Sequence, residues 1–210
     1  MTTTPEPRTR GSARTAVATA VALGVPLGAL TFALQLTPFG LVANSPAFWA
    51  MWGFAAGAIV AAPRAAVLTA TGVELLGLVS WYTTSWLTGN FEWSAGGSLA
   101  LGWGAGALAA GMVFGLAGAW WRTRATTPRL EIATAVPVSV FACAAVYYAF
   151  ILNYTATATY NAAVALLLLA FLPPANRDRL RAAAAVIPIT ALGIAGGAAF
   201  ITFLNAASGT

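Results

Sequence analysis

Apolar residues run through this chain in long blocks, separated by short polar stretches or by turns that contain glycine and proline. A helix needs roughly 20 mostly apolar residues to cross the hydrocarbon core of a membrane, which is about 30 Å thick. The pattern therefore predicts an all-α integral membrane bundle of about seven transmembrane helices. We expect them at about residues 15–36, 47–62, 65–87, 97–120, 130–152, 155–173 and 182–204.

The arginines predict how this bundle lies in the cell membrane. If the chain crosses seven times, every arginine falls on the same side, at positions 8, 10, 14, 64, 122, 124, 129, 177, 179 and 181. Cytoplasmic loops carry an excess of positive residues, so we expect a cytoplasmic N-terminus and an outer C-terminus. The predicted organisation is a disordered cytoplasmic tail (1–14), one transmembrane domain (15–204) and a short outer tail (205–210).

The amino-acid composition excludes several kinds of active site. The chain is 60% hydrophobic and only 7% charged, whereas soluble domains carry about a quarter charged residues. It has no histidine and one cysteine, which excludes imidazole-based triads, histidine-ligated metals and an internal disulfide. We expect no metal and no cofactor. The net charge of +5 comes from the arginines that orient the chain in the membrane and that also attract anionic lipid. No nucleic-acid partner is therefore expected.

Glycines recur at four-residue spacing in several blocks. Small residues at this spacing let helix backbones approach closely within a membrane. The pairs are Gly53 and Gly57, Gly102 and Gly106, Gly111 and Gly115, and Gly193 and Gly197. They predict close packing inside the bundle, or alternatively the seam of a homodimer.

Glu74 is the most informative polar residue, because it lies near the middle of the third block in LTATGVELLGLVSWYTTSW (68–86). An ionised carboxylate at the bilayer centre costs roughly 2.5–3.5 kcal/mol, so we expect the acid to be protonated. Intramembrane acids mark functional sites by default. The structural alternative is an interhelical hydrogen bond to Thr31 or Gln35 in the first block.

Helical spacing places a mildly polar stripe on the face of Glu74, made of Thr71, Gly77, Trp81 and Ser85. Aromatic residues also gather towards the outer boundary, where an ordinary interfacial belt is the alternative explanation. The predicted substrate pocket consists of Thr71, Trp81, Tyr82, Trp86, Trp52, Tyr147 and Tyr148.

Two further acids are weaker catalytic candidates. Glu92 lies in an outer loop between aromatic residues, where a solvent-exposed surface role is the alternative. Glu131 follows Arg129 at the start of the fifth block, where a carboxylate also favours the helix dipole.

These residues leave two functional classes open. The first is a metal-independent membrane enzyme in which Glu74 donates a proton to an isoprenoid-derived lipid and starts its cyclisation or isomerisation, with aromatic rings stabilising the cation. The second is a small-solute carrier or a substrate-binding membrane subunit, with Glu74 as a proton or cation site. A scaffold without a small-molecule site is a third possibility. The expected partners are the lipid bilayer and a lipophilic substrate.

The segments ANSPAFWAMWGFAAGAIVAAPRAAVLTATGVELLGLVSWY and GMVFGLAGAWWRT resemble a family of actinobacterial multi-pass membrane proteins of unknown function. The shared features are N-S-P-x-x-W before a glycine-containing helix, a short arginine turn, and a helix that ends in paired aromatic residues. The resemblance covers about residues 20–125. It implies a membrane fold and a bacterial group, but no activity.

In its size, number of spans and lone intramembrane acid, the chain is also similar to the small membrane-bound terpene cyclases of meroterpenoid biosynthesis. That similarity implies that an acid protonates a prenyl chain or its epoxide. Glu74 would take this role, with Glu92 or Glu131 as the second carboxylate. No complete motif of those cyclases is matched, which leaves the second carboxylate unassigned.

Overall fold

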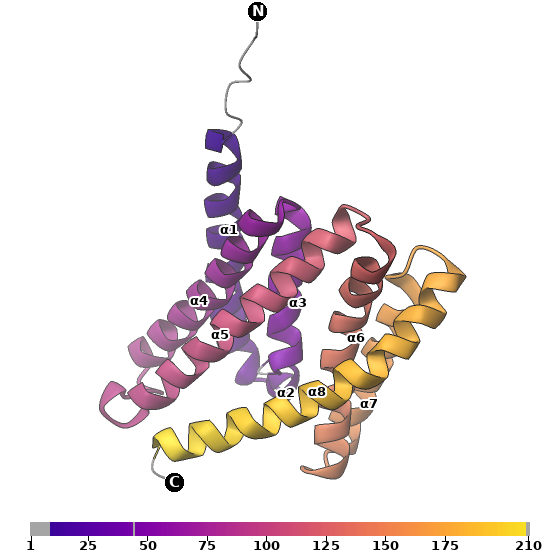
Figure 1. Cartoon of the computed structure of the whole chain (residues 1–210). Helices are drawn as coiled ribbons and strands as arrows, with labels where there is room; N and C mark the ends of the chain where they lie inside the picture. Colours follow the sequence, from indigo (N-terminus) through magenta and orange to yellow (C-terminus); the bar gives the residue numbers. More distant parts are fainter. Residues whose placement is uncertain (1–8, 44, 209–210) are drawn as a thin grey trace, which may run out of the picture.

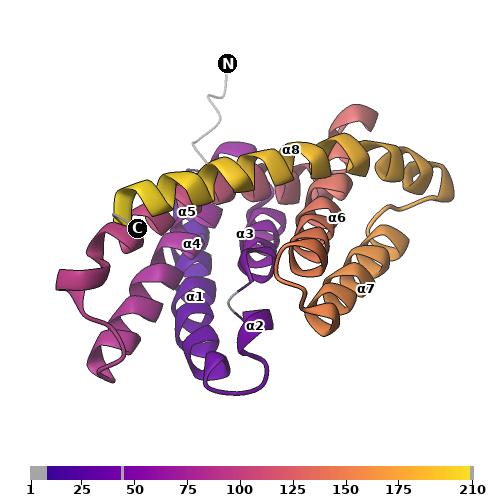
Figure 2. The same ribbon diagram turned by 90° about the horizontal axis from the view of Figure 1, so that it is seen from below.

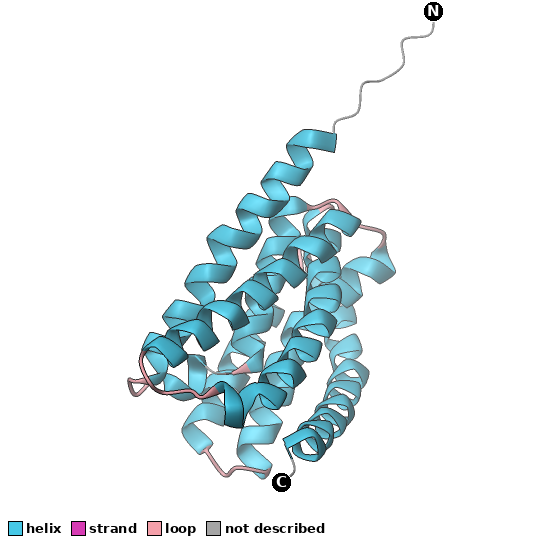
Figure 3. Cartoon of the chain, turned by 90° about the vertical axis from the view of Figure 1, so that its left-hand side faces the viewer, coloured by secondary structure: helices cyan, strands magenta, loops and turns pink. Residues whose placement is uncertain are grey.

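The computed structural model describes residues 9–43 and 45–208, and these residues form eight α-helices and no strand (Figure 3). This confirms the predicted all-α fold. The helices are α1 (Thr9–Gln35), α2 (Gly40–Ala43), α3 (Pro46–Val60), α4 (Pro63–Leu87), α5 (Trp93–Arg122), α6 (Thr127–Phe150), α7 (Thr155–Phe171) and α8 (Asn176–Ser208).

Each predicted block corresponds to one helix, and the differences lie in the connections. The short helix α2 occupies part of the predicted 37–46 loop. Helix α1 begins at Thr9, so residues 9–14 of the predicted tail are helical, and residues 1–8 lie outside the described residues. At the other end, α8 continues to Ser208, into the predicted outer tail.

Five helices are long and apolar enough to cross a membrane, namely α1, α4, α5, α6 and α8. Helices α3 and α7 are also apolar but have only 15 and 17 residues. At 1.5 Å per residue, α3 extends for about 22 Å, less than the thickness of a typical hydrocarbon core.

Helix α3 lies at the centre and contacts α1, α4, α5 and α6. Helices α1, α4 and α5 lie side by side, and α6 and α7 pair on the other side of α3 (Figure 1). The long helix α8 crosses obliquely over one face of the bundle and contacts α5, α6 and α7 (Figure 2).

The core consists of three clusters of small and aromatic side chains, each of which includes residues of α3. The first joins α3 to α5 and α6 around Phe54 and Phe114, and the second joins it to α1 and α4 around Leu27 and Val73. The third joins α3 to α6 and α7 around Phe141. A short central helix thus links the two halves of the bundle.

Glycines bring several helix backbones into direct contact. A Cβ atom built on Gly57 of α3 would touch the carbonyl oxygen of Gly115 of α5. On α1, a Cβ atom at Gly24 would lie 2.8 Å from the carbonyl oxygen of Val73. The predicted role of glycine in close packing is therefore confirmed for α3 and α5. By contrast, a Cβ atom at Gly197 of α8 would meet nothing within 4 Å.

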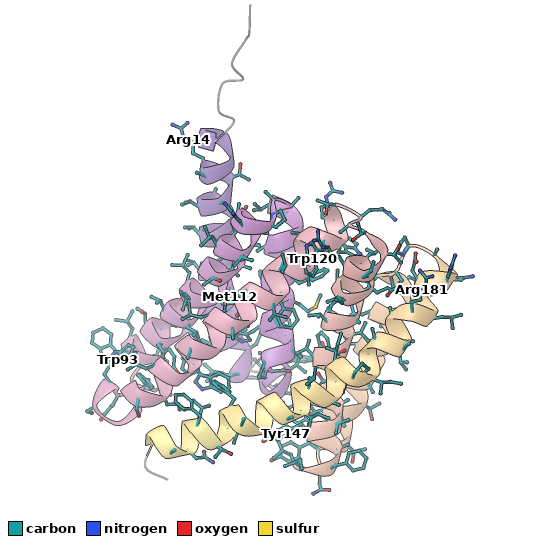
Figure 4. All side chains as sticks on the ribbon, viewed as in Figure 1. Arg14, Trp93, Met112, Trp120, Tyr147 and Arg181 are labelled. Carbon is teal, nitrogen blue, oxygen red and sulfur yellow. The ribbon has the colours of Figure 1, made fainter. Side chains whose placement is uncertain are left out.

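The two ends of the molecule differ in character. Arg14 and Arg181 lie at one end, and Trp93 and Tyr147 lie towards the other (Figure 4). Between the ends, large apolar side chains point outward, among them Leu68, which is 72% exposed, and Leu101, which is 78% exposed. Large apolar surfaces are rare on soluble monomers, and this surface suits contact with lipid chains.

The backbone contact at Gly57 can be tested with a matched pair of glycine variants. Alanine should favour both helices by up to about 1 kcal/mol through its higher helix propensity. In Gly57→Ala the added methyl group also collides with α5, and overpacking typically costs about 1–3 kcal/mol. We therefore expect Gly57→Ala to lower the melting temperature in detergent and Gly197→Ala to leave it unchanged or raise it. Equal shifts in the two variants would contradict the packing.

Candidate functional site

Glu74 lies on the inner face of α4, and its side chain is only 3% exposed. Its carboxyl group faces Gly53 of α3, where a built Cβ atom would lie 2.9 Å from Oε1 of Glu74. The same built atom would lie 3.6 Å from Cβ of Phe114 on α5. The acid therefore occupies the junction of three helices, and the missing side chain of Gly53 provides its space.

Oε1 of Glu74 is buried and has no hydrogen-bond partner among the described residues. An unsatisfied buried polar atom typically costs about 1–3 kcal/mol. Such atoms are few in native proteins, and each requires an explanation, such as a functional role. Glu74 thus carries an unfavourable interaction at the centre of an otherwise well-packed bundle.

The predicted structural partners of Glu74 do not satisfy this atom. The hydroxyl of Thr31 donates within its own helix, to the carbonyl oxygen of Leu27 at 2.7 Å. Helix α1 also places Thr31 away from the acid, because Gly24 faces Val73 and Gly28, one turn later, already faces Gly77. Gln35 lies a further turn along α1, so the expected hydrogen bond from the first block to Oε1 is not formed.

The predicted polar stripe on α4 does face the interior. Gly77 and Ser85 are buried, and Nε1 of Trp81 is buried without a hydrogen-bond partner in the described part of the chain. Glu74 and Trp81 are seven residues apart, which is two turns or about 10 Å along one face of the helix. An unpaired acceptor and an unpaired donor therefore lie on the same buried face.

Trp49 of α3 lies between these two groups. A Cβ atom at Gly77 would be 3.0 Å from Cζ3 of the Trp49 ring, and Gly77 is one turn from both Glu74 and Trp81. The ring is oriented by its Nε1, which donates to the carbonyl oxygen of Ala43 in α2 at 3.0 Å. Trp49 was not among the predicted pocket residues, although the N-S-P-x-x-W pattern contains it.

Trp81 also begins a chain of aromatic contacts. Its ring packs edge-on against Phe32 at 6.1 Å and against Tyr82 at 4.9 Å between centroids. The Tyr82 ring in turn lies 4.8 Å from Phe91 and 5.8 Å from Trp93. This cluster leads from the last third of α4 towards the end of the bundle that carries Trp93 (Figure 4).

The other predicted pocket residues are dispersed. Thr71 lies against Gly111 of α5, and Trp52 packs in the cluster around Leu27 and Val73. Trp86 is 53% exposed. Tyr147 and Tyr148 lie on α6, where their ring contacts are with each other and with Tyr154.

The three predicted catalytic carboxylates do not form one group. Glu92 is exposed and immediately precedes α5, at the end of the bundle that carries Trp93. Oε1 of Glu131 lies 3.4 Å from Nη1 of Arg181, at the opposite end. Among the described residues, no three His, Cys, Asp or Glu side chains are grouped to hold a metal ion. Glu74 is therefore the candidate site by itself.

Stability measurements distinguish a structural from a functional Glu74. Glu74→Met keeps a side chain of similar length and removes the unsatisfied acceptor, so we expect unfolding in detergent to become less favourable by about 1–3 kcal/mol. The exposed control Glu92→Met should change the melting temperature little. If Glu74→Met instead melts at a lower temperature, the carboxyl group holds the bundle together and its role is structural.

Comparison with known proteins places the chain in a family without assigning it an activity. A family of unknown function (DUF6518) matches residues 7–202. No curated protein and no solved structure shows significant similarity. The match agrees with the resemblance to a family of unknown function. It shows neither an actinobacterial origin nor a similarity to terpene cyclases. Because the match spans nearly the whole sequence, the chain belongs to the DUF6518 family.

Proposed function

We propose that this chain is an integral membrane protein that crosses the membrane seven times, with its N-terminus in the cytoplasm and its C-terminus outside. Apart from the single turn α2, successive helices run in alternate directions, so the turns before α4, α6 and α8 share one end of the bundle with the start of α1 (Figure 1). The described arginines lie in or next to these turns and helix starts, as the positive-inside rule requires. The shorter helices α3 and α7 complete the seven crossings.

Accessibility of single cysteines to a membrane-impermeant maleimide tests this topology. In a background in which Cys143 is replaced by alanine, Asn90→Cys should react in intact cells, because it lies in the turn between α4 and α5. Thr126→Cys, between α5 and α6, should react only after lysis. A cysteine added after Thr210 should react in intact cells. An inaccessible C-terminal cysteine would contradict an odd number of crossings.

For the activity, we propose that Glu74 acts as a Brønsted acid on a lipophilic, isoprenoid-derived substrate and starts its cyclisation or isomerisation. The observation that supports this is the enclosure of an unpaired carboxyl oxygen by apolar and aromatic groups. A dry, aromatic surrounding is what a carbocation requires, since water would quench it. A carrier would instead need a polar route to the acid.

The proposed reaction balances with one carboxyl group. The O–H bond of protonated Glu74 breaks, and its proton forms a C–H bond with an alkene, or an O–H bond with an epoxide whose C–O bond then opens. The resulting cation is stabilised by nearby ring faces, and the π electrons of a second double bond attack it, which closes a ring and leaves a new cation on the other carbon of that double bond. The Glu74 carboxylate finally removes a proton from the cation, which forms a new alkene and restores the acid. The product has the mass of the substrate, and no second carboxylate takes part.

Trp49 determines access to the acid in this proposal. Its ring lies against Gly77, between Glu74 and Trp81, so a substrate that spans the two groups must displace it. The hydrogen bond from its Nε1 to Ala43 is the contact that such a movement would break. With the ring displaced, the indole of Trp81 would form the far wall of the site.

A product search with matched variants tests the activity. Membranes that contain the wild-type protein, Glu74→Gln or Glu131→Gln are incubated with prenylated aromatic compounds and their terminal epoxides. Chromatography with mass spectrometry should reveal a product of unchanged mass in the wild-type and Glu131→Gln samples. We expect at least about a hundredfold less product with Glu74→Gln, since general acid catalysis typically contributes 10²–10⁴-fold.

The control variant makes the result decisive. Glu131 is a carboxylate of the same chain, but it pairs with Arg181 at one end of the bundle. Equal loss of product in Glu131→Gln and Glu74→Gln would indicate a general effect of the substitutions. Conversion that persists in Glu74→Gln would exclude this residue as the proton donor.

A small-solute carrier or substrate-binding subunit is the second candidate, and the isolation of Glu74 is compatible with it. No other described carboxylate lies beside this acid, and a lone carboxyl group suffices to bind one proton or one cationic group. If no isomeric product forms, uptake of small organic cations that depends on Glu74 would support this alternative.

A further inference from the structure

A pocket lies at the end of the bundle opposite Trp93, where the α5–α6 turn meets the end of α7. It has a volume of about 160 Å³, and a cavity of about 150 Å³ admits a molecule the size of benzene. Two arginines line one part of it, and mainly apolar side chains line the rest: Arg122 and Arg124, with Trp121, Leu130, Phe171 and Pro174.

The charges of the two arginines are not paired within the described part of the chain. In the ranges 9–43 and 45–208, neither guanidinium forms a salt bridge. The neighbouring basic groups are engaged: Arg129 stacks over the ring of Trp120 at 5.6 Å, and Arg181 pairs with Glu131. The nearest carboxylate along the chain, Glu131, is thus already paired, which leaves two arginines without a salt-bridge partner at the pocket.

The backbone at Arg124 is a second and independent observation. Arg124 follows the end of α5 in the left-handed conformation, with φ at 48°. Its N–H donates to the carbonyl oxygen of Trp121 at 3.2 Å, and the next N–H, of Ala125, donates to that of Trp120 at 3.0 Å. Helices that end in this way usually have glycine at the left-handed position, because a Cβ atom is unfavourable there. An arginine there reduces stability and places a charged side chain at the pocket.

The walls of the pocket combine rigidity with apolar surface. Nε1 of Trp121 donates to the carbonyl oxygen of Leu172 at 3.0 Å and ties the end of α5 to the end of α7. Phe171, the last residue of α7, is 79% exposed beside the two arginines. A free inorganic anion would gain nothing from these apolar groups, whereas a lipid presents a phosphate next to its glycerol and acyl carbons.

We propose that this pocket binds the phosphate headgroup of an anionic phospholipid in the cytoplasmic leaflet. Arg122 and Arg124 hold the phosphate, and Phe171 and Pro174 contact the glycerol and first acyl carbons. Basic pockets between helices on the cytoplasmic side are a known mode of lipid recognition. The cytoplasmic position of the site rests on the proposed topology, whereas its ligand does not depend on the activity proposed for Glu74.

Native mass spectrometry of the full-length protein in detergent tests the proposal. The probes are phosphatidylglycerol and phosphatidylcholine with identical acyl chains, each with and without millimolar inorganic phosphate. The wild-type protein should retain phosphatidylglycerol preferentially, and phosphate should not displace it. Arg122→Gln and Arg124→Gly should each weaken retention about fivefold, the effect of one basic residue at an anionic lipid surface.

Arg124→Gly separates binding from folding. Because glycine suits the left-handed backbone, this variant should melt at the same temperature as the wild type or higher while it loses lipid. The charge control is Arg64→Gln, which removes an arginine at the same end of the bundle but outside this pocket. Equal retention of the two lipids, displacement by phosphate, or an equal loss in Arg64→Gln would each overturn the proposal.

Discussion

Close contact between helix backbones is the constraint on which the rest of this structure depends. Glycines of α1 lie against α4, glycines of α5 also lie against α4, and glycines of α3 and α5 lie against each other, so three seams are packed at the level of the main chain. Lipid provides no hydrophobic drive between helices, and such contacts replace it with van der Waals packing. Seams this tight also decide which side chains are buried. A polar residue on α4 that faces them is removed from water and from lipid alike.

The burial of Glu74 without a side-chain donor among the described residues follows from this close packing. The glycine at position 53 leaves space for the carboxyl group but provides no side-chain donor for it. An apolar side chain at position 74 would fill the same space without the cost of an unsatisfied oxygen. Polar groups that reduce stability in this way are commonly retained for function, since stability and activity often trade against each other.

The positions of the helices could be predicted from the sequence, whereas the residues that contact Glu74 could not. Block length and hydrophobicity located seven of the eight helices that the described residues form, whereas α2 is a single turn that no periodicity could reveal. Glu74 was identifiable because any acid within an apolar block is conspicuous. Its contact with Gly53 depends on how α3 rotates against α4, which the sequence of neither helix encodes by itself. The separation of Glu92 from Glu131 was foreseeable, because the arginine pattern had already assigned them to opposite sides.

The same packing indicates where the bundle can open. Helix α3 is anchored in its second half, where Gly57 meets α5 and Phe54 packs against Gly118. Its first half packs through aromatic rings, and Trp49 rests on Gly77 with one hydrogen bond to the short helix α2. A rotation of one indole ring disturbs less packing than the separation of two backbones in contact. Any ligand of Glu74 should therefore reach it past the first turns of α3, on the side that leads through the Trp81 and Tyr82 rings.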